Sequence, residues 1–212
     1  VPMSPQQAVD KEAESWANIW QQGSVGQNPV WPEHLGQELP SIAVPMFRAA
    51  CATFPNSVGL GWDKLHPRAI SRCSDCIIEA LIKLFVLAEC AGIWPSSIGV
   101  IIVVMIPKSD GGRRPIGLFP TLVRVWMRTR LDIARQWQTI HDKPFMYAGP
   151  CKGADVASWK QSLLAEGARS FGLPYVCTLL DLIKAFDSVP FDCLVVCAVE
   201  LQYNLYLLRL SV

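Results

Sequence analysis

Residues 98–119 read IGVIIVVMIPKSDGGRRPIGLF, two apolar runs that are joined by an Asp-Gly-Gly sequence. Asp-Gly and Gly-Gly pairs are favoured in tight turns between antiparallel strands, because these residues accept positive φ angles. The stretch therefore predicts a β-hairpin. Its first run is continuous and rich in β-branched residues, which is typical of a strand that is buried on both faces.

Helical patterns dominate the remaining sequence. Ser4 and Gln7 have the spacing of a capping box, and Pro5 stands at the first helical position. A run of β-branched and apolar residues, YVCTLLDL at 175–182, predicts one further strand. Apolar spacing and helix stop signals predict helices over about residues 4–23, 45–54, 67–91, 120–137, 154–170 and 190–206. The expected fold is α+β and rich in helix.

The composition bounds the class of protein. The chain has 212 residues, of which 51% are hydrophobic, so it can bury a sizeable core. Its first residues lack the pattern of a secretory signal, and its longest apolar run, Ile98–Pro107, is about half the length that a spanning helix needs. We therefore expect an intracellular protein without a membrane segment, whose eight cysteines are reduced thiols.

The charge is distributed unevenly, although its net value is only +1. Residues 1–66 hold three basic and six acidic residues, whereas residues 108–143 hold eight basic and three acidic ones. Within the predicted helix 120–137, Arg124, Arg128 and Arg135 are spaced by four and seven residues, so they share one face. This face is predicted to follow nucleic-acid phosphates. The alternative is a solvated face of a core helix.

Three cations flank the turn of the predicted hairpin. Lys108 precedes the turn and Arg113 and Arg114 follow it, so all three belong to one projecting finger. Ammonium and guanidinium groups pair with phosphate oxygens, and such a finger could grip a triphosphate. The alternative is that these side chains only solvate an exposed turn.

A carboxylate follows the second predicted strand, in TLLDLIKAFDSVPFD at residues 178–192. Asp181 at the end of a buried strand is unfavourable unless it is paired or binds a metal, and Mg²⁺ prefers such oxygen ligands. Asp181 is therefore a candidate metal ligand, with capping of the next turn as the alternative. Asp187 precedes the helix that Pro190 begins, and we interpret it as a structural cap.

These segments resemble, in order and spacing, a reverse transcriptase of the type found in non-LTR retrotransposons and, more distantly, in group II introns. The resemblance covers about residues 59–200, and its motifs are IPKSDGGRRPIGL, the basic helix, YAGPCKGADVAS and LLDLIKAFDSV. The segment GLGWDKLHPRAI resembles the family's Gly-Pro-Asp-Gly loop, but Trp62 replaces the Pro and Lys64 the second Gly. The segment MYAGPCKGADVAS lacks the Arg of the family's corresponding motif.

The resemblance implies a right-hand polymerase with fingers and part of the palm, whose thumb is absent. It implies a helical extension and linker at residues 1–58, a fingers-like region at 59–150 and a truncated palm at 151–212. The parent protein would be an RNA-directed DNA polymerase that uses an RNA template, a DNA primer, dNTP and two Mg²⁺ ions.

The resemblance also assigns roles to single residues. Asp181 corresponds to the first metal-binding, catalytic aspartate, and the backbone of Leu182 lies beside the same ions. Lys108 and Arg114 correspond to contacts with the phosphates of the incoming nucleotide. Phe186 corresponds to an aromatic steric gate, because a buried ring leaves a 2′-hydroxyl neither room nor a hydrogen bond. The alternative for Phe186 is a core position between a strand and a helix.

The sequence holds no Asp-Asp pair, from which the family takes its remaining metal ligands. We therefore expect a fragment that does not polymerise by itself. The alternative is a catalytically dead remnant that binds nucleic acid. A zinc module built on Cys73 and Cys76 is disfavoured, because no matching pair follows within about 20 residues.

Overall fold

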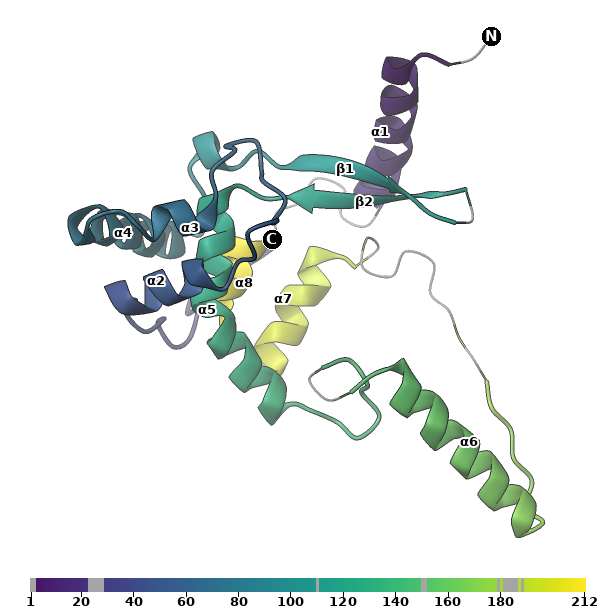
Figure 1. The fold of residues 1–212 in the computed structure, drawn as a ribbon. Coiled ribbons are helices and arrows are strands. Elements are labelled where there is room, and N and C mark those ends of the chain that lie inside the picture. The colour runs from purple at the N-terminus through teal and green to yellow at the C-terminus, as the bar shows by residue number, and fades with distance from the viewer. Residues whose placement is uncertain are drawn as a thin grey trace. The chain divides into compact units, whose positions relative to one another are not determined.

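The computed structural model describes residues 3–22, 29–109, 111–149, 152–178, 180, 187 and 189–212. For residues 21 and 22 it describes the backbone alone. These residues form a helix-rich α+β fold with one two-stranded antiparallel sheet (Figure 1). The elements are α1 (Pro5–Gln22), α2 (Val44–Ala52), α3 (Pro67–Ile70), α4 (Asp75–Ala91), the 3₁₀ helix η1 (Ser96–Ile98), β1 (Ile102–Pro107), β2 (Arg113–Leu118), α5 (Thr121–Ile140), α6 (Ala154–Ser170), α7 (Phe191–Glu200) and α8 (Leu205–Ser211).

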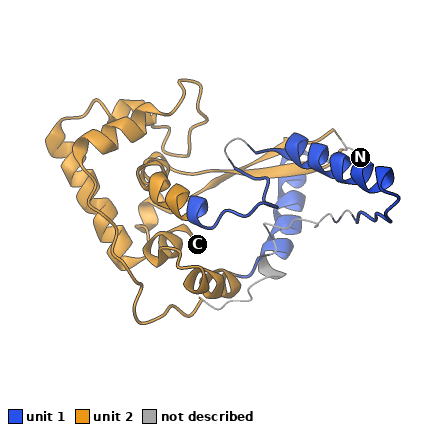
Figure 2. Cartoon of the chain, turned by 90° about the horizontal axis from the view of Figure 1, so that it is seen from below, with its two compact units in different colours: residues 1–27, 138–190 blue, residues 28–137, 191–212 orange. Residues whose placement is uncertain are grey.

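The chain divides into two compact units (Figure 2). Unit 1 comprises residues 1–27 and 138–190, and unit 2 comprises residues 28–137 and 191–212. The segments 1–58, 59–150 and 151–212 that the resemblance implies stay a prediction. Within unit 2, apolar residues of α2 and α8 lie in the same core as those of α4 and α5, and α7 packs against α8.

Aromatic rings fill the core of unit 2. Phe85 of α4 lies 5.7 Å from Phe47 and 6.0 Å from Trp94, and Trp94 contacts Trp126 of α5 edge-on at 5.4 Å. Edge-on pairs suit the charge distribution of aromatic rings. The buried cluster comprises Ile42, Phe47, Cys51, Phe54, Ile70, Ile78, Phe85, Ala88, Val125, Trp126, Leu207 and Leu210.

A buried ion pair crosses this core. Glu89 accepts hydrogen bonds from Arg130 Nε at 2.7 Å and Nη2 at 2.8 Å, and from Trp126 Nε1 at 2.7 Å. Arg130 Nη1 also donates to the carbonyl of Pro40 at 2.6 Å. Every carboxylate oxygen therefore has a partner, which is the condition under which a buried charge is tolerated.

Several helices begin and end as the sequence predicts. The capping box of α1 forms, with Ser4 N–H donating to Gln7 Oε1 at 2.9 Å and Gln7 N–H donating to Ser4 Oγ at 3.2 Å. Gly92 ends α4 with φ +70°, a left-handed conformation in which glycine is unstrained. The predicted helices at about 45–54, 120–137 and 154–170 are confirmed as α2, α5 and α6.

Two predicted helices are each interrupted. The helix predicted over 67–91 splits into α3 and α4, because Arg48 binds the carbonyls of Ser71 and Cys73 in the gap and also pairs with Asp75. The helix predicted over 190–206 splits into α7 and α8. There Asn204 caps α8 by accepting from Leu207 N–H at 3.1 Å.

The hairpin forms, but its predicted burial is wrong. β1 pairs with β2 from Ile102–Leu118 to Pro107–Arg113, so the paired strands are shorter than the predicted stretch 98–119. Ile102 remains 39% exposed and Val103 44% exposed, although they lie on opposite faces of the strand. The reason is that the hairpin extends from the helices of unit 2 as a two-stranded ribbon (Figure 1), so neither face is fully covered there.

The strand predicted at 175–182 does not form in the part of it that the structure describes. Residues 175–178 and 180 have no regular secondary structure, and Val176 and Leu180 are 88% and 86% exposed. Strand propensity is realised only where a second strand supplies hydrogen-bond partners.

Among the described residues, no helix is both long enough and apolar enough to cross a membrane.

Candidate functional site

The turn of the hairpin brings its two predicted phosphate-binding cations together. Lys108 N–H donates to the carbonyl of Gly112 at 2.8 Å, and Gly111 N–H donates to the carbonyl of Lys108 at 3.2 Å. Gly111 has φ +83°, which a residue with a side chain adopts only with strain. The register pairs Ile106 with Arg114, so the side chain of Arg114 emerges close to that of Lys108.

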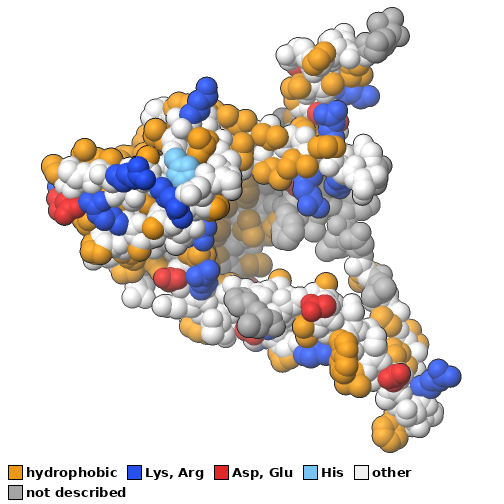
Figure 3. Space-filling view, viewed as in Figure 1, with side chains coloured by type: hydrophobic (Ala, Val, Ile, Leu, Met, Phe, Trp, Pro, Cys, Tyr) orange, Lys and Arg blue, Asp and Glu red, His pale blue; other side chains and the backbone are white. Residues whose placement is uncertain are grey.

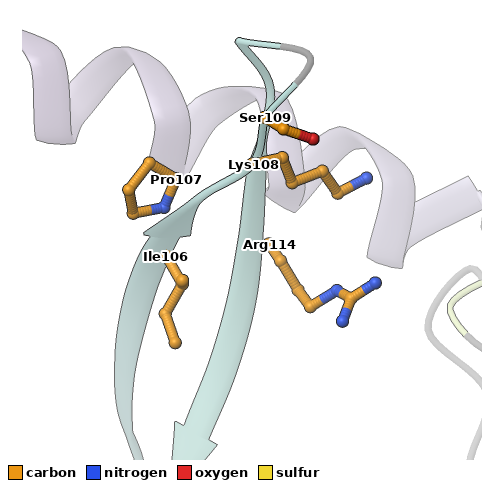
Figure 4. A pocket seen from close by; sticks show the side chains of 5 residues that line it. All are labelled: Ile106, Pro107, Lys108, Ser109 and Arg114. Carbon is orange, nitrogen blue, oxygen red and sulfur yellow. The ribbon is translucent and has the colours of Figure 1, made fainter.

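Lys108 and Arg114 line one open hollow of about 460 Å³. Figure 4 shows both side chains extending to the same side of the ribbon, with Ser109 above them. The lining that the structure describes is completed by Ile106 and Pro107, so it carries two cations, a hydroxyl and no acid. Such a set of donors can bind a group with several anionic oxygens.

The loop that resembles Gly-Pro-Asp-Gly fastens the base of the hairpin to α5. Asp63 Oδ2 accepts from Thr121 N–H at 2.7 Å, and Thr121 Oγ1 donates to the carbonyl of Leu65 at 2.6 Å. A Cβ at Gly61 would lie 2.6 Å from the carbonyl oxygen of Phe119, which is too close. The loop therefore fixes where β2 ends and α5 begins, and with it the direction of the finger.

Lys64 in this loop has φ +49°. A left-handed conformation is strained for a residue with a side chain and unstrained for glycine. Lys64 stands where the resembling loops carry their second Gly. The backbone thus keeps a conformation that suits glycine at the position where the sequence departs from the pattern.

The three arginines of the predicted basic face all lie on α5. Arg124 and Arg128 both lie over the ring of Phe54, at 5.2 and 5.1 Å from its centroid, and Arg124 Nη1 donates to the carbonyl of Gly59 at 2.6 Å. Burial lowers the pKa of the Arg124 guanidinium, Asp63 raises it and Arg128 lowers it. Arg135 lies about two turns further along and pairs with Asp132 at 3.6 Å.

Sequence reasoning missed two further cations of this region. Arg68 donates to the carbonyl of Ala52 at 3.2 Å and to Asn56 Oδ1 at 2.7 Å, and Arg72 is exposed four residues later. A signal was available, because residues 48–72 hold four basic residues and one acid. The charge count over residues 1–66 missed it, because that range ends before Arg68 and Arg72.

Three predicted site residues, Asp181, Leu182 and Phe186, lie outside the described residues. Asp187 is described, and its Oδ1 accepts from Trp20 Nε1 at 3.1 Å. The bond that the structure shows for this carboxylate therefore ties residue 187 to α1, in unit 1. The predicted role of Asp187 as a cap of the following helix stays a prediction.

The described residues contain no group of three or more His, Cys, Asp or Glu side chains that could hold a metal ion. Cys73 lies in the gap before α4 and Cys76 in its first turn, rather than in the middle of a continuous helix as predicted.

No family model matches the chain, and no curated protein matches it either.

Proposed function

We propose that the chain is the fingers and part of the palm of a retroelement reverse transcriptase, an RNA-directed DNA polymerase. The observation that carries this proposal is the convergence of Lys108 and Arg114 on one hollow at the tip of an exposed hairpin. In this proposal the hollow receives the triphosphate of an incoming dNTP.

The chemistry of the two side chains suits that ligand. A guanidinium can donate two parallel hydrogen bonds to one phosphate, whereas an ammonium acts as a mobile point charge on a flexible stem. Hydrogen bonds to charged groups contribute about 1.5–3 kcal/mol each. The exposed tip lets a ligand enter without a conformational change of the core, and the fastening of the loop at Asp63 keeps the finger aimed.

Two features of the sequence and backbone support the same proposal. The motifs occur in the order and at the spacing of the family over about residues 59–200. The left-handed backbone of Lys64 suits the glycine that the resembling loop carries. Arg124 and Arg128 supply positive charge for an RNA template and DNA primer on the same unit as the finger.

The remaining roles follow from the resemblance. Asp181 would hold Mg²⁺, which when bound neutralises charge on a transferring phosphate. The backbone of Leu182 would lie beside it, and Phe186 would exclude a 2′-hydroxyl. Because residues 1–212 contain no Asp-Asp pair, polymerisation in this proposal requires further carboxylates from outside these residues.

The test is nucleotide binding by the 212-residue chain, measured by calorimetric titration with dATP. Lys108→Ala and Arg114→Ala should each weaken binding about tenfold, which corresponds to about 1.4 kcal/mol. Arg113→Ala is the matched control: it removes the same charge one residue away, and strand alternation places it on the opposite face from Arg114.

We expect the control to weaken dATP binding by less than about threefold, since Arg113 lies on the face of the strand opposite the hollow and acts on a ligand there only by long-range attraction. An equal loss in all three variants would show that general attraction, rather than the hollow, binds the nucleotide. If Lys108→Ala and Arg114→Ala bind dATP like the unchanged chain, the proposed function is wrong.

A further inference from the structure

Helix α6 of unit 1 exposes an apolar stripe. Val156, Trp159 and Leu163 follow one another at spacings of three and four residues, which places them on one side of the helix. Trp159 is 71% exposed and Leu163 is 55% exposed, and α6 contains no buried residue. Figure 3 shows hydrophobic side chains at the surface along the helix that Figure 1 labels α6. A contiguous exposed patch of this kind is typical of a surface that binds another protein.

The rest of unit 1 holds α6 from the side away from the stripe. Ala157, Gln161 and Ala165 are half-buried there, at spacings of four residues. Gln161 Nε2 donates to the hydroxyl of Tyr175, in the segment that follows the helix. The helix is thus positioned by its own unit, while the stripe remains accessible to a partner.

The stripe has a large side chain near its start and open space near its end. Gly167 lies four residues after Leu163, and a Cβ at Gly167 would meet no atom within 4 Å. When two copies of α6 run antiparallel, the indole of each Trp159 can lie over Gly167 of the other copy. The Leu163 side chains of both copies then meet at the centre, as residues do at a two-fold axis.

The charges at the two ends of α6 fit the same arrangement. Asp155 lies in the first turn and Arg169 in the last turn, and their separation of fourteen residues is close to four turns, so they share one flank of the stripe. No ion pair between described residues involves either side chain. A two-fold axis between Ser162 and Leu163 brings the same flank of both helices together. Asp155 of each copy then lies opposite Arg169 of the other, to within the rise of one residue.

This alignment opposes no like charges within α6. Lys160 faces Ala165 of the other copy, and Glu166 faces Trp159. A parallel pair would instead bring the two acids of the first turns together and the two bases of the last turns together. The antiparallel direction also places the positive end of one helix dipole beside the negative end of the other. The charge pattern therefore fits a second copy of this chain, in one direction.

We propose that the chain forms an antiparallel homodimer through the stripe of α6. The proposal is independent of the proposed nucleotide site, because Lys108 and Arg114 belong to unit 2. With 17 residues, α6 is about 26 Å long. A contact between two such helices is at the small end of specific interfaces, at about 1,200 Å² or less. We therefore expect a reversible dimer with a micromolar dissociation constant.

The experiment is sedimentation velocity of the 212-residue chain over a concentration series from about 1 to 200 μM, which brackets a micromolar dissociation constant. Leu163→Glu should weaken the dimer by at least about tenfold, because it places two carboxylates at the apolar centre of the contact. The matched control is Leu87→Glu. Leu87 is an exposed leucine of α4 in unit 2, and its variant should dimerise like the unchanged chain.

An exchange of charges tests the direction of the pair. Asp155→Arg and Arg169→Asp should each weaken self-association by about tenfold, because each replaces two attractions across the axis by two repulsions. An equimolar mixture of the two variants should restore association, since every Arg then faces an Asp of the other variant. A charge effect on the helix itself, which favours an acid in its first turn and a base in its last, would persist in the mixture.

A mass of one chain at every concentration overturns the proposal and favours another occupant of the stripe, such as the further palm elements that the proposed function requires. A dimer that Leu163→Glu leaves intact, or that Leu87→Glu weakens equally, overturns it too. A mixture of the charge variants that associates no better than each variant alone overturns the antiparallel arrangement. Circular dichroism of each variant shows that α6 still forms, and retained dATP binding by Leu163→Glu shows that unit 2 is intact.

Discussion

The buried pair between Glu89 and Arg130 allows a prediction about stability that the structure makes quantitative. Glu89 accepts three hydrogen bonds, two from Arg130 and one from Trp126, and Arg130 is 3% exposed. Glu89→Gln keeps the shape of the side chain but removes its charge, and it turns an amide NH₂ toward one donor. Arg130 is then a buried cation without a counter-charge.

Removing one partner of a buried ion pair lowers the free energy of unfolding by about 3–5 kcal/mol. We expect a loss of about 3 kcal/mol for Glu89→Gln, because one amide oxygen still accepts a hydrogen bond. For a protein whose total stability is roughly 5–15 kcal/mol, this is a large fraction. Arg130→Met should lose a similar amount, since it leaves the Glu89 carboxylate buried and unpaired.

The double variant Glu89→Gln with Arg130→Met removes both charges and combines the two single changes. Its loss should be smaller than the sum of the single losses by about 3 kcal/mol, although the carbonyl of Pro40 loses its partner. The assay is urea unfolding followed by tryptophan fluorescence and by far-ultraviolet circular dichroism. A loss below about 1 kcal/mol for Glu89→Gln, or additive single losses, would refute the reasoning.

Three further predictions concern other residues. Lys64→Gly should raise the free energy of unfolding by about 0.5–1 kcal/mol in the same urea assay. The change removes left-handed backbone strain of about 1–2 kcal/mol, whereas the greater conformational entropy of glycine in the unfolded chain costs about 0.5–1 kcal/mol. A destabilised variant would contradict this prediction. Burial raises the pKa of Cys51 to about 11, so mass spectrometry after alkylation at mildly alkaline pH should find exposed Cys76 modified and Cys51 intact until the chain is unfolded. The 212-residue chain should extend no primer, and magnesium-dependent incorporation of dNTP that Asp181→Ala abolishes would contradict this.

Local signals in the sequence predicted local structure well. Ser4, Gln7 and Pro5 define the start of α1 because a capping box involves only neighbouring residues. Gly92 ends α4 for the same kind of reason. The Asp-Gly-Gly turn predicted the hairpin, and the register that forms brings Lys108 and Arg114 together as the sequence analysis expected.

Predictions that depended on distant partners failed or remain predictions. The gap between α3 and α4 requires Arg48, which lies more than 20 residues before it and binds the carbonyls there. β1 has the composition of a buried strand, yet its burial depends on whether other elements cover it, and no local pattern encodes that. The roles of Asp181, Leu182 and Phe186 remain predictions, because these residues lie outside the described part of the chain.

The sequence by itself determined the helices, the turn and the order of the motifs, because these depend on side chains within one or two turns of each other. Tertiary structure alone decided that Arg68 lies beside the same segment as Arg124 and Arg128, since the carbonyls and the ring that contact these side chains belong to residues 52–59. It also decided that Glu89 and Arg130 meet in the core. From the sequence alone, both residues would be expected at the surface, because charged side chains are rarely buried. Charge acts through space, so its partners are set by packing rather than by position along the chain.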